Sequence, residues 1–203
     1  RFGAVCRSDL ALHRRASELN QPLQLGSLMW DDPLLNLYLR HAAKDDPSLL
    51  AKATANYQGI AADLEKRVED RHAGDLGHGA LLAHVLARKT GLAARLFDAW
   101  ERADRGALSE VRTLIPPLTA SLEALSASMR RLWLSTCKPF GLEVLQIRFA
   151  GLVARTRELD QRLGEYLAGE RSTIPELDEY RHGVFLPEGW LRYRALATGA
   201  RVF

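Results

Sequence analysis

A regular stripe of apolar residues in the middle of the chain restricts its fold more than any other feature. Leu118, Leu122, Leu125, Met129 and Leu132 follow one another in steps of four, three, four and three residues. This spacing places the five side chains on one face of an α-helix, as in the seam of a helical bundle. The segment therefore predicts a long helix that packs against other helices.

A loop containing Pro139 and Gly141 follows this stripe, and a second apolar stripe begins directly after the loop. Pro cannot continue a helix, and Gly is common where a helix ends. The second stripe has helical spacing and consists of Leu145, Phe149, Leu152, Leu159, Leu163 and Tyr166. The sequence thus predicts a helical hairpin whose second helix covers residues 143–168.

The rest of the chain gives similar but less regular patterns. Further helices are predicted over residues 4–19, 34–39, 47–71, 80–104, 107–132 and 173–180. The composition agrees, because Ala, Leu, Arg and Glu are frequent and favour helix over strand. We therefore expect an all-α fold, a bundle of about five long antiparallel helices with short helices and an irregular C-terminal tail.

Residues that break or begin helices set the expected boundaries. Asp31-Asp32-Pro33 and Asp45-Asp46-Pro47 are interpreted as helix starts, because Asp can cap free amides and Pro is tolerated in the first turn. Pro116-Pro117 is expected to kink or break the fourth helical segment. We also expect a linker or short strand over residues 23–27, a glycine-rich turn over residues 72–79, and a helix end at Arg105-Gly106.

These boundaries suggest three parts of the chain. Residues 1–27 are predicted to form an N-terminal helix and linker, residues 28–182 the helical bundle, and residues 183–203 a C-terminal tail packed on the bundle. The tail is expected to be irregular because it contains Pro187, Gly189 and Gly199.

No catalytic or metal-binding pattern stands out among the polar residues. The pairs Asp31-Asp32 and Asp45-Asp46 could act as acid/base groups or metal ligands, but capping is the simpler interpretation since each pair precedes a helix-opening Pro. The six histidines form no HExxH motif and no metal-binding spacing with cysteine. We therefore expect no cofactor and no metal.

Charge and hydropathy restrict the partners and the location. The formal net charge is +3, and the basic residues are interleaved with acids, so we expect no nucleic-acid binding. No apolar run is long enough for a membrane span, and no leader is visible. Only Cys6 and Cys137 are present, so no disulfide framework is needed. We expect a cytoplasmic protein that does not bind membranes.

Particular stretches of the sequence resemble one known family. They are residues 131–155 with the run Lys138-Pro139-Phe140-Gly141-Leu142-Glu143, the stretches 166–169 and 174–179, and Asp32-Pro33-Leu34-Leu35 near the start. These are similar to the C-terminal helical region of bacterial beta-N-acetylhexosaminidases of glycoside hydrolase family 20. The resemblance covers residues 27–180 and is strongest from residue 131 onward.

The resemblance implies a function that depends on another part of a longer polypeptide. In this family a (β/α)8 barrel carries an adjacent catalytic Asp-Glu pair. The pair Asp178-Glu179 lies near the tail and not at the end of a barrel strand, so we do not assign it that role. The resemblance implies an accessory domain, inactive alone, that supports the barrel of the same polypeptide or subunit assembly, including a homodimer. The alternative is a free-standing helical module for protein–protein interaction.

The hairpin corner is the best candidate for a contact with the barrel or with a partner. A Pro/Gly loop that carries Lys138 and Phe140 lies here between two amphipathic helices. The candidate contact residues are Trp133, Lys138, Phe140 and Arg148.

Overall fold

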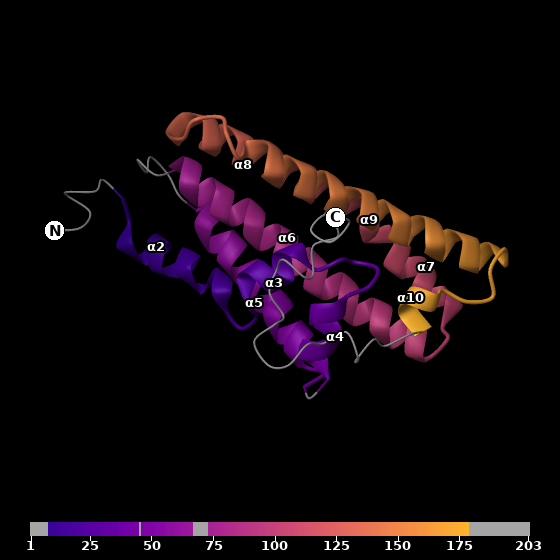
Figure 1. The fold of residues 1–203 in the computed structure, drawn as a ribbon. Helices are drawn as coiled ribbons and strands as arrows, with labels where there is room; N and C mark the ends of the chain where they lie inside the picture. Colours follow the sequence, from indigo (N-terminus) through magenta and orange to yellow (C-terminus); the bar gives the residue numbers. More distant parts are fainter. Residues whose placement is uncertain (1–7, 45, 67–72, 179–203) are drawn as a thin grey trace.

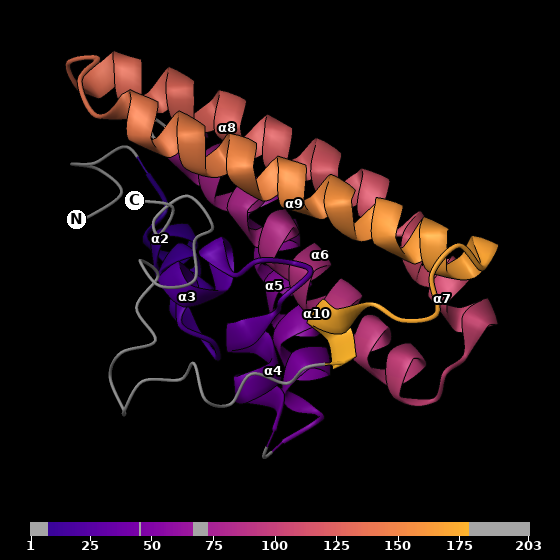
Figure 2. The same cartoon turned by 45° about the vertical axis from the view of Figure 1, so that its right-hand side comes forward.

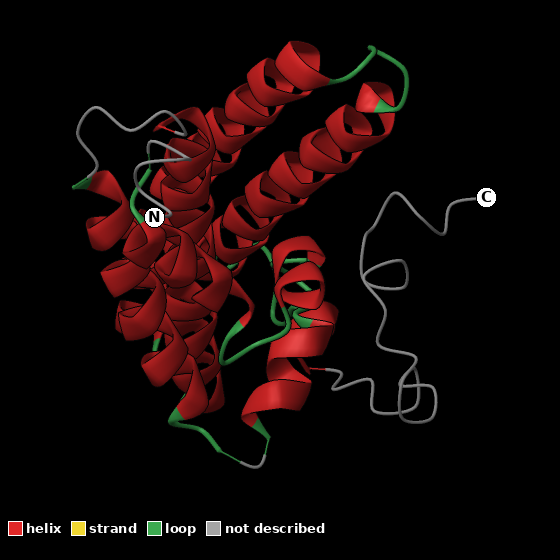
Figure 3. Cartoon of the chain, turned by 90° about the vertical axis from the view of Figure 1, so that its left-hand side faces the viewer, coloured by secondary structure: helices red, strands yellow, loops and turns green. Residues whose placement is uncertain are grey.

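A computed structural model describes residues 8–44, 46–66 and 73–178 of the chain. These residues form helices joined by loops, and none of them belongs to a strand (Figure 3). The all-α fold predicted from the sequence is therefore confirmed. The predicted tail, residues 183–203, lies outside the described residues. The division into three parts stays a prediction.

Four of the described helices are long, where about five were expected. They are α5 (Leu49–Glu65), α6 (Ala73–Glu101), α8 (Ile115–Thr136) and α9 (Leu142–Ala168). The shorter elements are α2 (Leu10–Ser17), η1 (Glu18–Asn20), α3 (Leu25–Trp30), α4 (Leu37–Ala43), α7 (Arg105–Thr113) and α10 (Pro175–Asp178). The helix predicted over residues 4–19 is described only from Leu10 onward.

The long helices pack in the order of the chain. Helix α5 lies against α6, α6 against α8, and α8 against α9. Figures 1 and 2 show α8 and α9 running side by side as a long hairpin on top of the molecule. The short α2 packs against α5 and α6, and α3 packs against α4 and α6. The predicted helical hairpin is thus present.

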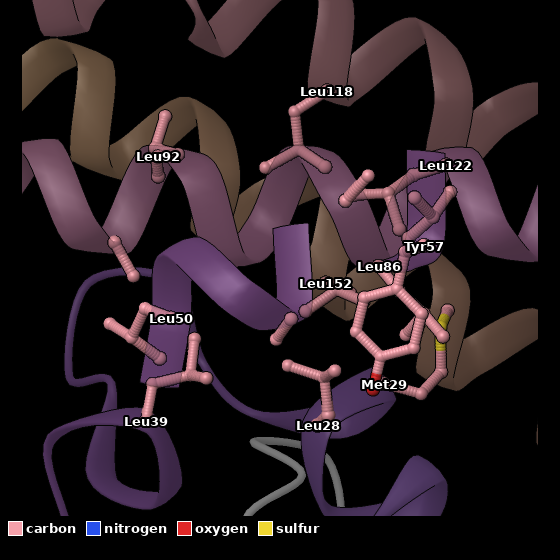
Figure 4. Close-up of a cluster of buried hydrophobic side chains, with 14 of the residues drawn as sticks. Leu28, Met29, Leu39, Leu50, Tyr57, Leu86, Leu92, Leu118, Leu122 and Leu152 are labelled. Atoms are coloured by element: carbon pink, nitrogen blue, oxygen red, sulfur yellow. The ribbon is translucent and has the colours of Figure 1, made fainter. Parts of the chain in front are cut away.

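The hydrophobic core lies where the long helices meet the N-terminal elements. Figure 4 shows side chains from α3, α4, α5, α6, α8 and α9 in one cluster. Tyr57, Leu86 and Leu122 are completely buried there. Complete burial of one leucine side chain stabilises a fold by about 2 kcal/mol. The chain therefore builds a substantial core from its own residues.

Three predicted boundaries were wrong, and the error at residues 72–79 reflects tertiary packing. The expected linker over residues 23–27 contains the start of α3 at Leu25. The expected turn over residues 72–79 is helical from Ala73 onward. A Cβ atom at Gly79 would lie 3.1 Å from Leu64 Cδ1, and one at Gly74 would lie 3.7 Å from Leu132 Cδ2. Gly79 allows close approach of α5 and α6, whereas a Cβ atom at Gly74 would make only an ordinary contact, and neither glycine breaks α6.

The third error concerns Arg105-Gly106, which begins a helix and does not end one. Helix α6 ends at Glu101, and Ala103 has a left-handed φ of 50° that turns the chain. Asp104 then caps α7, since its Oδ1 accepts a hydrogen bond of 2.9 Å from the amide of Ala107.

The break expected at Pro116-Pro117 is confirmed, and it lies at Leu114, two residues before Pro116. Helix α7 ends at Thr113 and α8 begins at Ile115, so both prolines occupy the first turn of α8. Amides in a first turn have no partner within the helix, and the missing N–H of Pro costs little there.

Candidate functional site

The turn between α8 and α9 is held by bonds within the hairpin. Trp133 Nε1 donates a hydrogen bond of 2.9 Å to the carbonyl of Lys138. Glu143 accepts a hydrogen bond of 2.8 Å from the amide of Gly141. Gly141 has a φ of 94°, a conformation that residues with a Cβ atom rarely adopt. These bonds give the turn a defined shape.

Four large apolar side chains at this end of the hairpin point into solvent. Phe140 is 81% exposed, Ile147 62%, Val144 54% and Leu134 42%. Val144 and Ile147 are three residues apart on the first turns of α9, which places them on one face, and Phe140 lies in the turn just before this helix. We call these four residues the hairpin tip. Among the described residues, one other large hydrophobic side chain, Leu10, is exposed.

Basic side chains surround the hairpin tip. Arg130, Arg131 and Lys138 are all exposed. Their side chains make no ion pair or hydrogen bond with any described residue. The single acid between Arg130 and Ile147 is Glu143, whose carboxylate binds the amide of Gly141. This end of the molecule therefore combines an apolar surface with unpaired positive charge.

The structure brings together three of the four candidate contact residues. Trp133, Lys138 and Phe140 meet at the turn, whereas Arg148 lies about two helical turns further along α9. The guanidinium of Arg148 stacks over the ring of Trp30 at 4.7 Å from its centroid. Trp30 in turn packs edge-on against Phe149, with ring centroids 5.2 Å apart. Arg148 thus joins α9 to α3, and a contact with a partner stays a prediction.

The acidic pair Asp31-Asp32 caps the backbone, as predicted, but from a buried loop. Asp32 Oδ1 accepts hydrogen bonds from the amides of Leu34 at 2.8 Å and Leu35 at 3.0 Å. Asp31 accepts hydrogen bonds from the amides of Tyr38 and Leu39 at the start of α4. Residues 33–36 thus form a capped turn. For this reason the helix after Pro33 begins at Leu37, later than expected.

Two cations that sequence reasoning missed hold this loop. Lys89 Nζ donates hydrogen bonds to the carbonyls of Met29 at 2.8 Å and Asp31 at 2.7 Å. Arg155 Nε lies 2.6 Å from Asp32 Oδ2. We call Asp31, Asp32, Lys89 and Arg155 the buried charge cluster. A sequence signal for Lys89 existed, since it occupies a position in the apolar stripe of α6.

Burial shifts the ionisation of this cluster toward neutral forms. Desolvation raises the pKa of Asp31 to about 6, although the charge of Lys89 and the amides of Leu39 and Tyr38 act in the opposite direction. Desolvation also lowers the pKa of Lys89 to about 8, against the attraction of Asp31 and Asp32. Asp31, Asp32 and Lys89 are closed from solvent, being at most 2% exposed, whereas the side chain of Arg155 is 27% exposed. The three buried members can fix a loop, but they offer no access to a substrate.

The other acidic candidates also have structural roles. Asp46 accepts a hydrogen bond of 2.9 Å from the amide of Ser48 just before α5. Asp178 accepts a hydrogen bond of 3.0 Å from Trp100 Nε1. Asp45 and Glu179 lie outside the described residues.

Among residues 8–44, 46–66 and 73–178, no group of three His, Cys, Asp or Glu side chains is arranged to hold a metal ion. None of the helices described is long and apolar enough to span a membrane.

Comparison with known proteins gives one family. The family model described as "Glycoside Hydrolase 20C C-terminal domain" matches residues 13–188, most of the 203-residue chain. No curated protein is significantly similar to the chain.

Proposed function

Because the chain belongs to the family of glycoside hydrolase 20C C-terminal domains, we propose that it is the accessory domain of a beta-N-acetylhexosaminidase-like enzyme and docks on the catalytic barrel of the same polypeptide. The parent enzyme removes terminal N-acetylhexosamine residues, and this domain supports the barrel without taking part in the chemistry. The observation that carries the proposal is the exposed hairpin tip.

The exposure of the hairpin tip is unfavourable for a domain that works alone. Phe140 is 81% exposed and Ile147 on α9 is 62% exposed, although α9 buries Phe149 and Leu152 almost completely. Covering a large apolar side chain contributes about 1.5–3 kcal/mol. Several exposed apolar side chains at one end of a helical hairpin are typical of a surface that contacts another protein or domain.

The location of the hairpin tip also fits a domain that precedes this one. The beginning of α2, in indigo, and the α8–α9 turn lie at the same end of the molecule in Figures 1 and 2. A catalytic domain that enters through α2 would therefore come close to the hairpin tip. Trp133 and Gly141 hold the turn in one shape, so little ordering is needed on docking.

The test introduces Phe140→Ser and Ile147→Ser together, both in the full-length enzyme and in the 203-residue chain. In the chain alone we expect a change in stability within about 0.5 kcal/mol, because both side chains are solvated there. In the full-length enzyme we expect a lower thermal midpoint and faster amide exchange of the hairpin. Phe149→Ser, at a buried site on the same helix, serves as a control that destabilises both proteins.

Two outcomes would contradict the docking proposal. One is that Phe140→Ser with Ile147→Ser leaves both the stability of the full-length enzyme and the amide exchange of its hairpin unchanged. The other is conversion of a dimeric enzyme to a monomer with no change in contact between the domains, which would make the hairpin tip a subunit interface.

A second experiment addresses catalysis. The 203-residue chain is incubated with a chromogenic N-acetylglucosaminide, and we expect no hydrolysis, because Asp31, Asp32 and Asp46 bind backbone amides and Asp178 binds the indole of Trp100. Hydrolysis above the buffer rate would show that the chain is an enzyme by itself.

A further inference from the structure

Resting on the docking function proposed above, we infer that the surface which receives the hairpin tip is an apolar patch bordered by carboxylates, and hence belongs to the catalytic domain and not to a second copy of this chain. The inference concerns the chemistry of the partner surface. It follows from the charges that surround the hairpin tip.

The positive charges lie directly beside the apolar residues. Arg130 precedes Leu134 by one helical turn on α8, so both lie on the same face. Lys138 lies in the turn two residues before Phe140. The side chains of Arg130, Arg131 and Lys138 have no ionic partner among the described residues, unlike Arg15, Arg112 or Arg162 elsewhere on the surface.

The acid nearest in sequence does not balance these charges. Glu143 Oε2 accepts a hydrogen bond from the amide of Gly141 at the start of α9, where the helix dipole also favours a negative charge. Arg130 and Lys138 therefore lie beside the apolar centre without an ion pair to any described residue, whereas Arg131 lines a pocket with Glu65 and His78. Protein interfaces commonly have an apolar centre and a polar rim, and the rim selects the partner by charge.

This charge pattern disfavours contact between two hairpin tips. In a twofold symmetric dimer the same patch meets itself, so Arg130 and Lys138 of both copies would come together. Like charges brought together at an interface cost several kcal/mol. A surface with Asp and Glu around an apolar centre would instead pair with Arg130 and Lys138, and Arg forms especially favourable bidentate contacts with carboxylates.

The experiment reverses the rim charges in the full-length enzyme. The rim variant combines Arg130→Glu with Lys138→Glu. The matched control, called the α6 variant, combines Arg88→Glu with Arg95→Glu. Both of these arginines are exposed on α6 and have no ion pair among the described residues. We expect hairpin amide exchange to rise about tenfold in the rim variant at low salt, and to stay unchanged in the α6 variant. Sodium chloride at about 0.5 M should raise exchange in the wild type but not in the rim variant.

The outcomes separate this inference from the function on which it rests. If Phe140→Ser with Ile147→Ser releases the hairpin but the rim variant does not, the acidic border is wrong and the docking function stands. If neither variant has an effect, both proposals fail.

Two further measurements on the 203-residue chain test whether the hairpin tip binds a second copy of the chain or a membrane instead. Sedimentation should give a monomer, and a dimer that Phe140→Ser abolishes would overturn the inference. The chain should not bind vesicles of phosphatidylserine and phosphatidylcholine. Binding that requires Phe140 and Lys138 would assign the hairpin tip to a membrane surface and overturn the inference as well.

Discussion

Lys89 shows how strongly a single residue can influence the arrangement of this fold. It lies among Val85, Leu92 and Leu96 on the inward face of α6, where a leucine would be expected. Its ammonium group binds two carbonyls at the end of α3 and in the following loop. A buried charge costs several kcal/mol unless it is paired and hydrogen-bonded. The contacts with the loop offset that cost, and they hold α3 against α6.

Replacement of Lys89 by Met tests this role. The variant keeps the apolar stem but leaves the carbonyls of Met29 and Asp31 without their donor, and Asp31 without a neighbouring positive charge. We expect the free energy of unfolding in urea to fall by about 3 kcal/mol. Arg95→Met, at an exposed position of the same helix, should change it by no more than about 0.5 kcal/mol. Equal effects of the two variants would contradict the role assigned to Lys89.

The buried charge cluster also predicts a pH dependence of stability. Burial raises the pKa of Asp31 from its ordinary 3.8 to about 6, so the folded chain holds this proton more tightly than the unfolded chain. The contribution of Asp31 to the free energy of unfolding therefore falls as the pH rises from about 4 to about 6. Burial lowers the pKa of Lys89 from 10.5 to about 8. Its contribution to the free energy of unfolding therefore rises as the pH increases from about 8 to about 10.5.

The measurement compares urea unfolding of the wild type and Asp31→Asn at several pH values. The stability of the wild type relative to Asp31→Asn should decrease between about pH 4 and pH 6, since position 31 no longer titrates in the variant. A relative stability that increases over this range would mean that the pKa of Asp31 is lowered in the fold.

At the scale of single elements, the α8–α9 turn depends on Gly141 for two separate reasons. Its φ of 94° is unfavourable for a residue with a side chain, and an added Cβ atom would lie 3.3 Å from Trp133 Cζ2. Gly169 after α9 has a similar φ of 81°, but an added Cβ atom there would meet nothing within 4 Å. Comparison of the two positions therefore separates backbone strain from crowding.

Alanine substitutions at three glycines should give three different results in chemical denaturation. Gly169→Ala should destabilise the chain by about 1 kcal/mol through backbone strain alone. Gly141→Ala should cost more, because Trp133 must also move. Gly91→Ala, inside α6 and 3.5 Å from Thr54 Cγ2, should stabilise by about 0.5–1 kcal/mol, because alanine is the better helix former. An equal loss of stability in Gly141→Ala and Gly169→Ala would exclude crowding by Trp133.

Apolar periodicity was enough to predict the elements that bury a continuous stripe, but not those that depend on tertiary contacts. Leu118 to Leu132 gave α8 and its hairpin with α9. The start of α6 was missed, because Gly74 and Gly79 read as turn residues until Leu132 and Leu64 are seen to pack against them. The exposure of Phe140 was not visible in the sequence either, since an apolar residue in a loop can be covered by any other segment.

The described chain behaves as one packed unit at the scale of the whole molecule. Its core is a single cluster of buried side chains that extends from Leu19 to Leu177. At the Leu19 end of the cluster, η1 contacts α5. At the Leu177 end, Arg40 Nη2 of α4 donates a hydrogen bond of 3.1 Å to the carbonyl of Leu177. Segments far apart in the sequence therefore support one another.

This continuity predicts a single cooperative unfolding transition. Trp30, Trp100 and Trp133 report on the α3–α9 contact, the α6–α10 contact and the hairpin turn. In a Trp190→Phe background, their fluorescence and the far-ultraviolet circular dichroism should change at the same urea concentration. Phe149→Ala removes a buried ring that contacts Trp30 and should lower both midpoints together, with a loss of about 3 kcal/mol. A fluorescence transition that precedes the loss of helix would instead show that the N-terminal elements or the hairpin turn unfold separately from the α5–α6–α8 core.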